Sequence, residues 1–565
     1  MLSFSIVLVF ISFALCYLFK PQWRGKANQP SLPPGPKPWP IVGNLPQLIK
    51  SKKTTSVSHW IHHFMKEMNT EIACIRLGNV HVIPVTCPEI SREFLKKRDD
   101  IFASRPLTMA TDVLSKGHLG PIFAPSGDQW KKMKRIMVSE MLSKARHQWL
   151  YEKRVEEADN LVRYVHNQCK NSDGGGLVNL RVAARHYCGN VTRKLVFNQR
   201  YFGEGKADGG PGFEEEEHIE AIFNSLAYIY SFCISDYLPI LRGLDLEGHE
   251  KIMKKATKVM DKYHDPIIED RIRKQRDGKI DEPQDLLDVL VTLTDDNGAS
   301  LLSANEIKVQ ICEIMVAAVD NPSNALEWAL AEMLNKPEML QKAIDELDRV
   351  VGKYRLVQES DFPQLNYVKA CAREAFRLHP ISPFIPPHVS VIDTTVGDYF
   401  IPKGSYVILS REGLGRNPKV WDDPYEFKPY RHLQDCKEGE EVVLTEPEMR
   451  FISFSRGRRG CPGVMLGSSM TTMLFARLLQ GFDWSIPDNQ GAIDLSQGKE
   501  DSFLAKPLLA VAKPRLPPHV YSFPRDENTN HDAETGTVLR SRLDLQQVSG
   551  DMLVVESELK TSHKA

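Results

Sequence analysis

Cys461 lies in the stretch of this 565-residue chain whose residue types are best suited to chemistry. Residues 451–467 have the sequence FISFSRGRRGCPGVMLG, which is dense in Gly and Arg and leads into an apolar run. This order predicts a tight loop that presents a sulfur just before a helix begins. The positive end of that helix and the cations of Arg456, Arg458 and Arg459 would lower the pKa of the thiol. The stretch therefore predicts a thiolate that can bind a metal.

The spacing within this loop follows a known pattern, F-x-x-G-x-R-x-C-x-G, formed by Phe454, Gly457, Arg459, Cys461 and Gly463. The pattern resembles the haem-binding loop of the cytochrome P-450 superfamily of haem–thiolate monooxygenases. A lone cysteine cannot hold zinc or an iron–sulfur cluster, which need several ligands, so haem ligation suits the chemistry. The resemblance implies haem b with Cys461 as the axial ligand of its iron. An inert cysteine in a Gly-rich turn is the alternative.

The resemblance covers about residues 30–521. It implies the cytochrome P-450 fold, mainly α with a smaller β part, around one haem, and it implies dioxygen as co-substrate. No G-x-G-x-x-G opens a helix after a strand, so electrons must come from a partner, which the resemblance names as NADPH–cytochrome P-450 reductase. A net charge of −1 gives no indication of nucleic-acid binding, and ten cysteines without C-x-x-C spacing favour a reducing compartment.

The ends of the chain differ in composition from its body. Residues 1–20 are almost entirely apolar and predict a transmembrane anchor helix, just long enough to cross a hydrocarbon core of about 30 Å. Basic residues follow, which predicts a single anchor in the endoplasmic reticulum membrane and a cytosolic body; a cleaved signal peptide is the alternative. Residues 21–40 form a basic and Pro-rich hinge, 41–521 the monooxygenase domain, and 522–565 a polar tail that we expect to be disordered.

Trp130 and Lys134 are four residues apart and would share one face of a helix. The family places Trp-x-x-x-Arg here to reach a haem propionate, and Lys134 would neutralise a carboxylate as a point charge without the guanidinium fork. The neighbouring cations Lys131, Lys132 and Arg135 predict a docking patch for an acidic electron donor. A solvated basic face is the alternative.

Two further segments carry candidate ligand-binding residues. The resemblance places the first substrate-facing loop at 102–128, which includes Arg105 and His118, although a surface loop is the default expectation for both. Many members of the family have Arg at the position of His388, where it pairs with a propionate. A satisfied core histidine is the alternative for His388.

A capping box, Ser303-x-x-Glu306, predicts the start of a long helix that runs to about Asn335. Pro322 interrupts this helix and should kink it, because its ring removes one backbone donor and clashes with the preceding turn. A kink would open a groove for water and dioxygen. A merely tolerated proline is the alternative.

Asp320, Asn321 and Ser323 are the candidate catalytic residues of this groove. Most of the superfamily has an acidic residue followed by Thr, but here Asn321 follows Asp320. An amide cannot rotate a hydroxyl proton toward oxygen, so proton delivery would pass through ordered water or Ser323. The Asn-Pro-Ser sequence and His388 resemble the plant amino-acid N-hydroxylases that make aldoximes.

Glu374 and Arg377, three apart in a helix over 370–379, match the superfamily's E-x-x-R. Arg431 would complete this structural triad, which lies behind the haem in the family. The family usually has Glu before that arginine, whereas this chain has Tyr430.

Three local patterns complete the expectations. Residues 71–86 predict a hairpin around Gly78, and residues 395–409 a second hairpin that turns between Pro402 and Gly404. Residues 203–218 have the composition of a loop with a solvated acidic run.

The resemblance implies an amino-acid N-monooxygenase, which converts an L-amino acid to its aldoxime by two N-hydroxylations, dehydration and decarboxylation, a first step toward cyanogenic or other defence compounds. Phenylalanine is the favoured substrate, with valine or isoleucine next. The substrate carboxylate needs a cation, for which Arg105 is the candidate. The alternatives are a carbon-hydroxylating or oxime-metabolising microsomal cytochrome P-450, or a non-catalytic haem-binding scaffold, which the departures at Lys134 and Tyr430 would suit.

Overall fold

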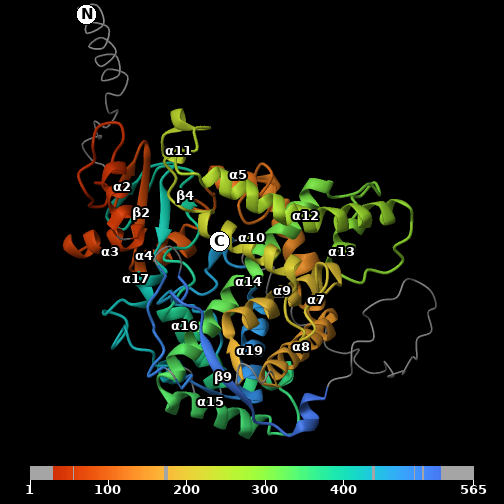
Figure 1. Cartoon of the computed structure of the whole chain (residues 1–565). Coiled ribbons are helices and arrows are strands. Elements are labelled where there is room, and N and C mark those ends of the chain that lie inside the picture. The colour runs from red at the N-terminus through yellow and green to blue at the C-terminus, as the bar shows by residue number, and fades with distance from the viewer. Residues whose placement is uncertain are drawn as a thin grey trace, which may run out of the picture. The chain divides into compact units, whose positions relative to one another are not determined.

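A helical region and a smaller strand-rich region make up the described part of the chain in the computed structural model (Figure 1). The structure describes residues 30–54, 56–170, 176–435, 440–488, 490–498 and 502–522. The predicted anchor and all but the first residue of the predicted tail lie outside these ranges. None of the described helices combines the length and the apolar character needed to cross a membrane.

The long helix predicted after Ser303 is α14 (Ala304–Leu334), which runs through the centre of the helical region (Figure 1). The Ser303 hydroxyl accepts a hydrogen bond from the Glu306 N–H, and the Glu306 carboxylate accepts one from the Ser303 N–H, so the capping box is confirmed. With 31 residues, the helix is about 46 Å long, and Pro322 lies inside it. Its neighbours are α9 (Leu180–Phe197), α16 (Asn366–Leu378) and α19 (Val464–Gly481).

Six further helices in the described part of the chain have ten or more residues. They are α2 (Leu45–Thr54), α3 (Val57–Glu67), α8 (Tyr151–Lys170), α10 (Phe213–Tyr228), α12 (His249–Arg276) and α15 (Pro337–Val350). Shorter helices include α4 (Pro88–Arg92), α5 (Met109–Leu114), α6 (Asp128–Ile136), α7 (Lys144–Trp149), α11 (Ile234–Tyr237), α13 (Leu286–Thr292), α17 (Arg411–Gly415) and α18 (Tyr430–Gln434). Helix α6 shows why such segments fold as they do: it buries Trp130, Met133 and Ile136 on one face and exposes Lys131 and Arg135 on the other.

The largest sheet has the strand order β1-β2-β7-β4. β1 (Ile75–Leu77) and β2 (Val80–Val85) are antiparallel around Gly78, whose φ is +55°, so the first predicted hairpin is confirmed. β7 (Tyr406–Leu409) runs parallel to β2, and β4 (His388–Val389) runs antiparallel to β7. A three-stranded sheet has the order β3 (Leu177–Asn179), β9 (Leu509–Pro514) and β8 (Phe482–Ser485).

The structure corrects two local expectations. The second hairpin is formed by β5 (Thr394–Val396) and β6 (Tyr399–Ile401), because Gly397 adopts a φ of +55° and permits a tighter turn; β7 then pairs with β2 instead. The acidic run begins α10 instead of lying in a loop. Glu215 within it is buried and accepts a hydrogen bond at 2.5 Å from Arg193.

Candidate functional site

Cys461 is held by the backbone of its own loop, because its N–H donates to the Phe454 carbonyl at 2.8 Å. A single 3₁₀ turn over Gly457–Arg459 precedes it, and α19 begins three residues after it. Gly457 has a φ of +74°, and a Cβ there would lie 2.1 Å from the Leu95 carbonyl oxygen, so only glycine fits. The predicted tight loop before a helix is confirmed.

The charges around Cys461 differ from the expectation. Burial raises the pKa of its thiol, although a backbone hydrogen bond from Gly463 and the charge of Arg411 act in the opposite direction. The Arg458 guanidinium lies 3.4 Å from the Asp99 carboxylate. The Arg459 guanidinium donates to the carbonyls of Ala103 and Ala124, each at 2.6 Å. The expected lowering of the pKa by the loop arginines is therefore wrong. Coordination to a metal would deprotonate this thiol.

Helix α14 has one accessible face in the middle of a buried stretch. Ala317, Ala318 and Asn321 keep accessible surface while the residues around them are buried, and Cys461 is accessible too. Arg411 lies within electrostatic range of both Asp320 and Cys461. The middle of α14 and the cysteine loop therefore approach one another around an interior space.

The three candidate catalytic residues are placed differently on this helix. Asn321 belongs to the accessible face, whereas Asp320 and Ser323 are buried. The Ser323 hydroxyl lies 2.9 Å from the carbonyl oxygens of both Val319 and Asp320, so its proton is donated within the helix. Ser323 is thus poorly placed to pass a proton to the interior space, which leaves Asn321 and ordered water.

The predicted Trp130–Lys134 pair is confirmed. The Lys134 ammonium lies 5.2 Å from the centre of the Trp130 ring, and the Arg459 guanidinium lies 4.2 Å from the same ring. Lys134 also donates to the Arg458 carbonyl. The indole therefore joins a cation from α6 to a cation from the cysteine loop.

Arg105 and His388 meet beside this group. Val389, next to His388, donates to the Ser104 carbonyl at 3.0 Å, which brings the two segments together. Arg105 is buried, not in a surface loop, and donates to the carbonyls of Pro386 and Pro387 at 2.7 and 2.8 Å. His118, in contrast, bonds to Thr111 on α5 at 3.0 Å and stays with its own loop.

His388 is only half satisfied. Its Nδ1 donates to the Phe102 carbonyl at 2.8 Å, while its buried Nε2 and the buried Nε of Arg105 have no hydrogen-bond partner among the described residues. Burial lowers the pKa of His388, and so do the charges of Arg105 and Arg459. The Arg105 Nε is a donor without an acceptor, and the His388 Nε2 becomes a second donor when the ring is protonated beside an anion.

These residues form what we call the cation cluster, in which the cations Arg105, Lys134 and Arg459 lie beside the imidazole of His388. In the described part of the chain their side-chain hydrogen bonds all go to backbone carbonyls. Burial lowers the pKa of Arg459 to about 9. Because buried cations without anionic partners are costly, the cluster is suited to an anionic ligand.

The predicted triad of Glu374, Arg377 and Arg431 is assembled. The Arg377 guanidinium donates to both Glu374 oxygens at 2.8 and 2.7 Å, and Arg431 donates to one of them at 3.2 Å. His432, which the sequence did not single out, lies 2.8 Å from the other oxygen. Burial opposes ionisation, but the hydrogen bonds from Arg377 and His432 lower the pKa of Glu374 to about 2. Tyr430 is 59% exposed and does not take part.

The predicted docking patch is only partly free. The Lys132 ammonium lies 2.8 Å from Glu306 at the start of α14, and the Lys131 ammonium lies 3.1 Å from Asp128. Arg135 is exposed. A role of this face in docking an electron donor stays a prediction.

Most of this chain matches one family model. The family model described as cytochrome P-450 matches residues 33–513.

The chain belongs to the cytochrome P-450 family.

This cytochrome P-450 is similar to N-monooxygenases of several amino acids. It is 58% identical to isoleucine N-monooxygenase 1 of Lotus japonicus, over 92% of this chain and 96% of the relative. It is 59% identical to a phenylalanine N-monooxygenase of Prunus mume, over 87% of this chain and 91% of the relative. It is 57% identical to a tyrosine N-monooxygenase of Sorghum bicolor, over 87% and 88% of the two chains. The named substrates differ while the identities hardly do, so overall identity does not select the substrate.

As a cytochrome P-450, the protein is a haem–thiolate monooxygenase that uses haem iron, electrons derived from NADPH and dioxygen as co-substrate. Cytochromes P-450 of this kind receive the electrons from a partner reductase. The residues fit the haem: Cys461 would be its sulfur ligand, and the cation cluster suits the two propionates of the porphyrin. When bound, the haem would supply the chemistry that activates dioxygen. A thiolate ligand favours this chemistry because it donates electron density to the iron.

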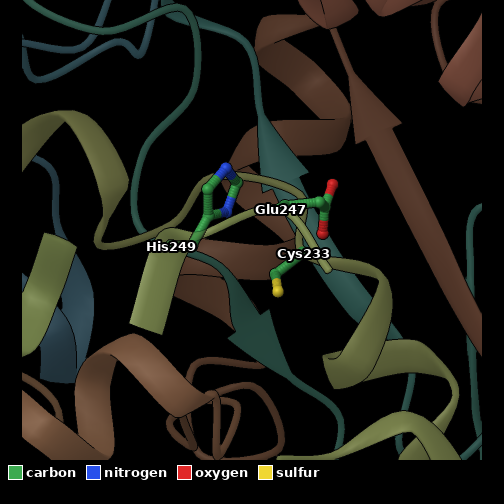
Figure 2. A group of neighbouring side chains, drawn as sticks. All are labelled: Cys233, Glu247 and His249. Atoms are coloured by element: carbon green, nitrogen blue, oxygen red, sulfur yellow. The ribbon is translucent and has the colours of Figure 1, made fainter. Parts of the chain in front are cut away.

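A second group of ligand-type side chains lies away from the haem site of this cytochrome P-450. Figure 2 shows Cys233, Glu247 and His249, the one such group of three found among the described residues, with ligand atoms within 4.8 Å of one another. One Glu247 oxygen lies 3.1 Å from the Lys52 ammonium, and the other accepts from the Ile234 N–H at 2.8 Å. The carboxylate is thus already engaged, and these contacts tie the loop between α11 and α12 to α2.

Proposed function

We propose that this cytochrome P-450 converts an L-amino acid to its aldoxime by two N-hydroxylations, dehydration and decarboxylation. One observation carries the proposal: Asn321 occupies the accessible face at the middle of α14, where most of the superfamily has an alcohol. An amide can hold water there but cannot itself relay a hydroxyl proton. The similarity to the isoleucine, phenylalanine and tyrosine enzymes supports the same reaction class. We propose phenylalanine as the first substrate to test, with valine and isoleucine next.

The departures from the family pattern do not argue for a non-catalytic scaffold. Lys134 keeps the contact with Trp130, and Tyr430 lies on the surface away from Glu374.

We also propose that residues 1–20 anchor the protein in the endoplasmic reticulum membrane, with the haem domain in the cytosol, because an apolar run followed by basic residues favours that orientation. Removal of residues 1–29 should move the protein from the membrane fraction to the soluble fraction.

The test is a panel of substrates. Membranes that contain the protein and a reductase are incubated with NADPH and each protein amino acid, and oximes are measured by mass spectrometry. We expect oxime from one or a few apolar amino acids and none from the Cys461→Ala variant. Oxidised product without any oxime would instead indicate a carbon-hydroxylating enzyme and would overturn the proposal.

A further inference from the structure

Arg411 is a cation that stands apart from the cation cluster. It is the first residue of α17, where the Ser410 hydroxyl caps the helix by accepting from the Gly413 N–H at 2.8 Å. The residues on either side of it face α3: the Ser410 hydroxyl lies 2.7 Å from one His62 nitrogen, and Glu412 lies 3.6 Å from the other. The Arg411 N–H donates to the Pro383 carbonyl at 2.8 Å, and the same segment is tied to α14 because the His379 carbonyl accepts from Asn324 at 3.4 Å. The charge of Arg411 also acts on Asp320 of α14.

The guanidinium of Arg411 lies inside the protein and is incompletely satisfied. Its Nε is buried and has no hydrogen-bond partner among the described residues. The residue nevertheless keeps accessible surface, although burial is the main influence on its pKa and lowers it to about 10. The guanidinium is thus only partly enclosed by the protein. At neutral pH the side chain carries its charge.

The place of this charge distinguishes Arg411 from the other buried cations. The charges of Arg105 and Arg459 interact with each other, and burial and these charges lower the pKa of His388. These residues are therefore grouped beside Trp130, whose ring contacts Arg459. The groups that act on Arg411 are Asp320 and Cys461 instead. The cation cluster can thus serve the haem propionates, while Arg411 adds a separate positive charge near the middle of α14.

We propose that Arg411 binds the α-carboxylate of the amino-acid substrate and so holds the amino nitrogen beside Asp320 and Asn321. This inference rests on the proposed function. A guanidinium presents a planar fork that matches a carboxylate in two parallel hydrogen bonds. The positive charge of Arg411 complements the carboxylate of an amino-acid zwitterion, and the negative charge of Asp320 complements its ammonium group. In this inference Arg411 takes the carboxylate-binding role that the sequence indicated for Arg105, which lies in the cation cluster.

The test compares ligands with and without a carboxylate. L-phenylalanine and L-isoleucine are titrated into the haem-loaded full-length protein, as are 2-phenylethylamine and 2-methylbutylamine, and binding is followed by the shift in haem absorbance. For Arg411→Gln we expect the Kd of the amino acids to rise by about 10- to 100-fold, the range for loss of a charged hydrogen-bonding partner. The Kd of the amines should change less than about threefold, within the scatter expected for a group that does not touch the ligand.

Companion variants make the result specific. Arg411→Lys keeps the charge without the fork and should give an intermediate Kd. Arg105→Gln should lower the haem content, whereas the exposed Arg135→Gln should change neither the haem content nor the amino-acid Kd.

Three outcomes would overturn the inference: an unchanged amino-acid Kd in Arg411→Gln, an equal loss for amines and amino acids, or loss of haem in both Arg411 variants. If the wild type forms oxime while one of these occurs, only this inference fails. If the wild type forms no oxime from any amino acid, the proposed function fails with it.

Discussion

Arg377 donates to both oxygens of Glu374, at 2.7 and 2.8 Å, and neither side chain has accessible surface. The two residues are three apart on α16, so the helix itself sets their geometry. Arg431 and His432 approach the same carboxylate from α18. This carboxylate therefore connects two helices, and its ionisation is linked to folding.

Glu374→Gln should reduce stability most near neutral pH. The pKa of Glu374 is lowered from 4.5 to about 2 in the folded protein, so its contribution is full above about pH 4.5 and is lost as the pH falls toward 2. The shift corresponds to roughly 3 kcal/mol. Thermal melting followed by circular dichroism should show a large difference between wild type and variant at pH 7 and less than half of that difference at pH 3. The exposed Glu448→Gln serves as the control, and an equal difference at both pH values would contradict the assignment.

Cys461→Ala should abolish the haem–thiolate absorption band of the reduced carbon-monoxide complex, because no other residue of the loop supplies a thiol. Oxime formation should fall below detection. Cys169→Ala, which changes a half-buried thiol on α8, should leave the band unchanged. Retained turnover in Cys461→Ala would refute the ligand assignment.

His388→Phe should weaken haem retention, because it removes the buried Nε2, which donates to a propionate once that anion favours protonation of the ring. His388→Arg should retain haem, since a guanidinium can donate to the same carboxylate. The measurement is the ratio of haem to protein after gel filtration, which we expect to fall at least about threefold in His388→Phe, the effect of a lost hydrogen bond to a charged group. His118→Phe is the control, because His118 bonds within its own loop. Equal haem content in His388→Phe and wild type would show that His388 is a core residue only.

Asn321→Thr should change the coupling of NADPH use to oxime formation, because it places a hydroxyl on the accessible face of α14. Ser323→Ala should change it little, since that hydroxyl already donates within the helix. The two variants are compared by oxime and hydrogen peroxide formed per NADPH consumed. A larger effect of Ser323→Ala than of Asn321→Thr would reverse the assignment of the groove residues.

Several elements of the fold could be predicted from local sequence patterns. The capping box at Ser303, the hairpin at Gly78 and the helix with Glu374 and Arg377 all depend on residues within a few positions of one another, and all are confirmed. The expectation for β7 failed because strand pairing is decided across the chain: β7 pairs with β2, more than 300 residues earlier. Composition alone also misplaced Glu215, which is buried and paired with Arg193, a residue outside the acidic run.

The sequence by itself determined the family, the sulfur ligand and the triad, because each is encoded in residue types at fixed short spacings. Only the tertiary structure decided how the cations divide. Arg105 and Arg411 are both arginines near the haem site, and nothing in their local sequence distinguishes their roles. Folding places Arg105 with His388 and Arg459, and Arg411 with Asp320 and Cys461. The physical reason is that electrostatic interactions depend on distance in space, which the chain sets by bringing together residues far apart in sequence.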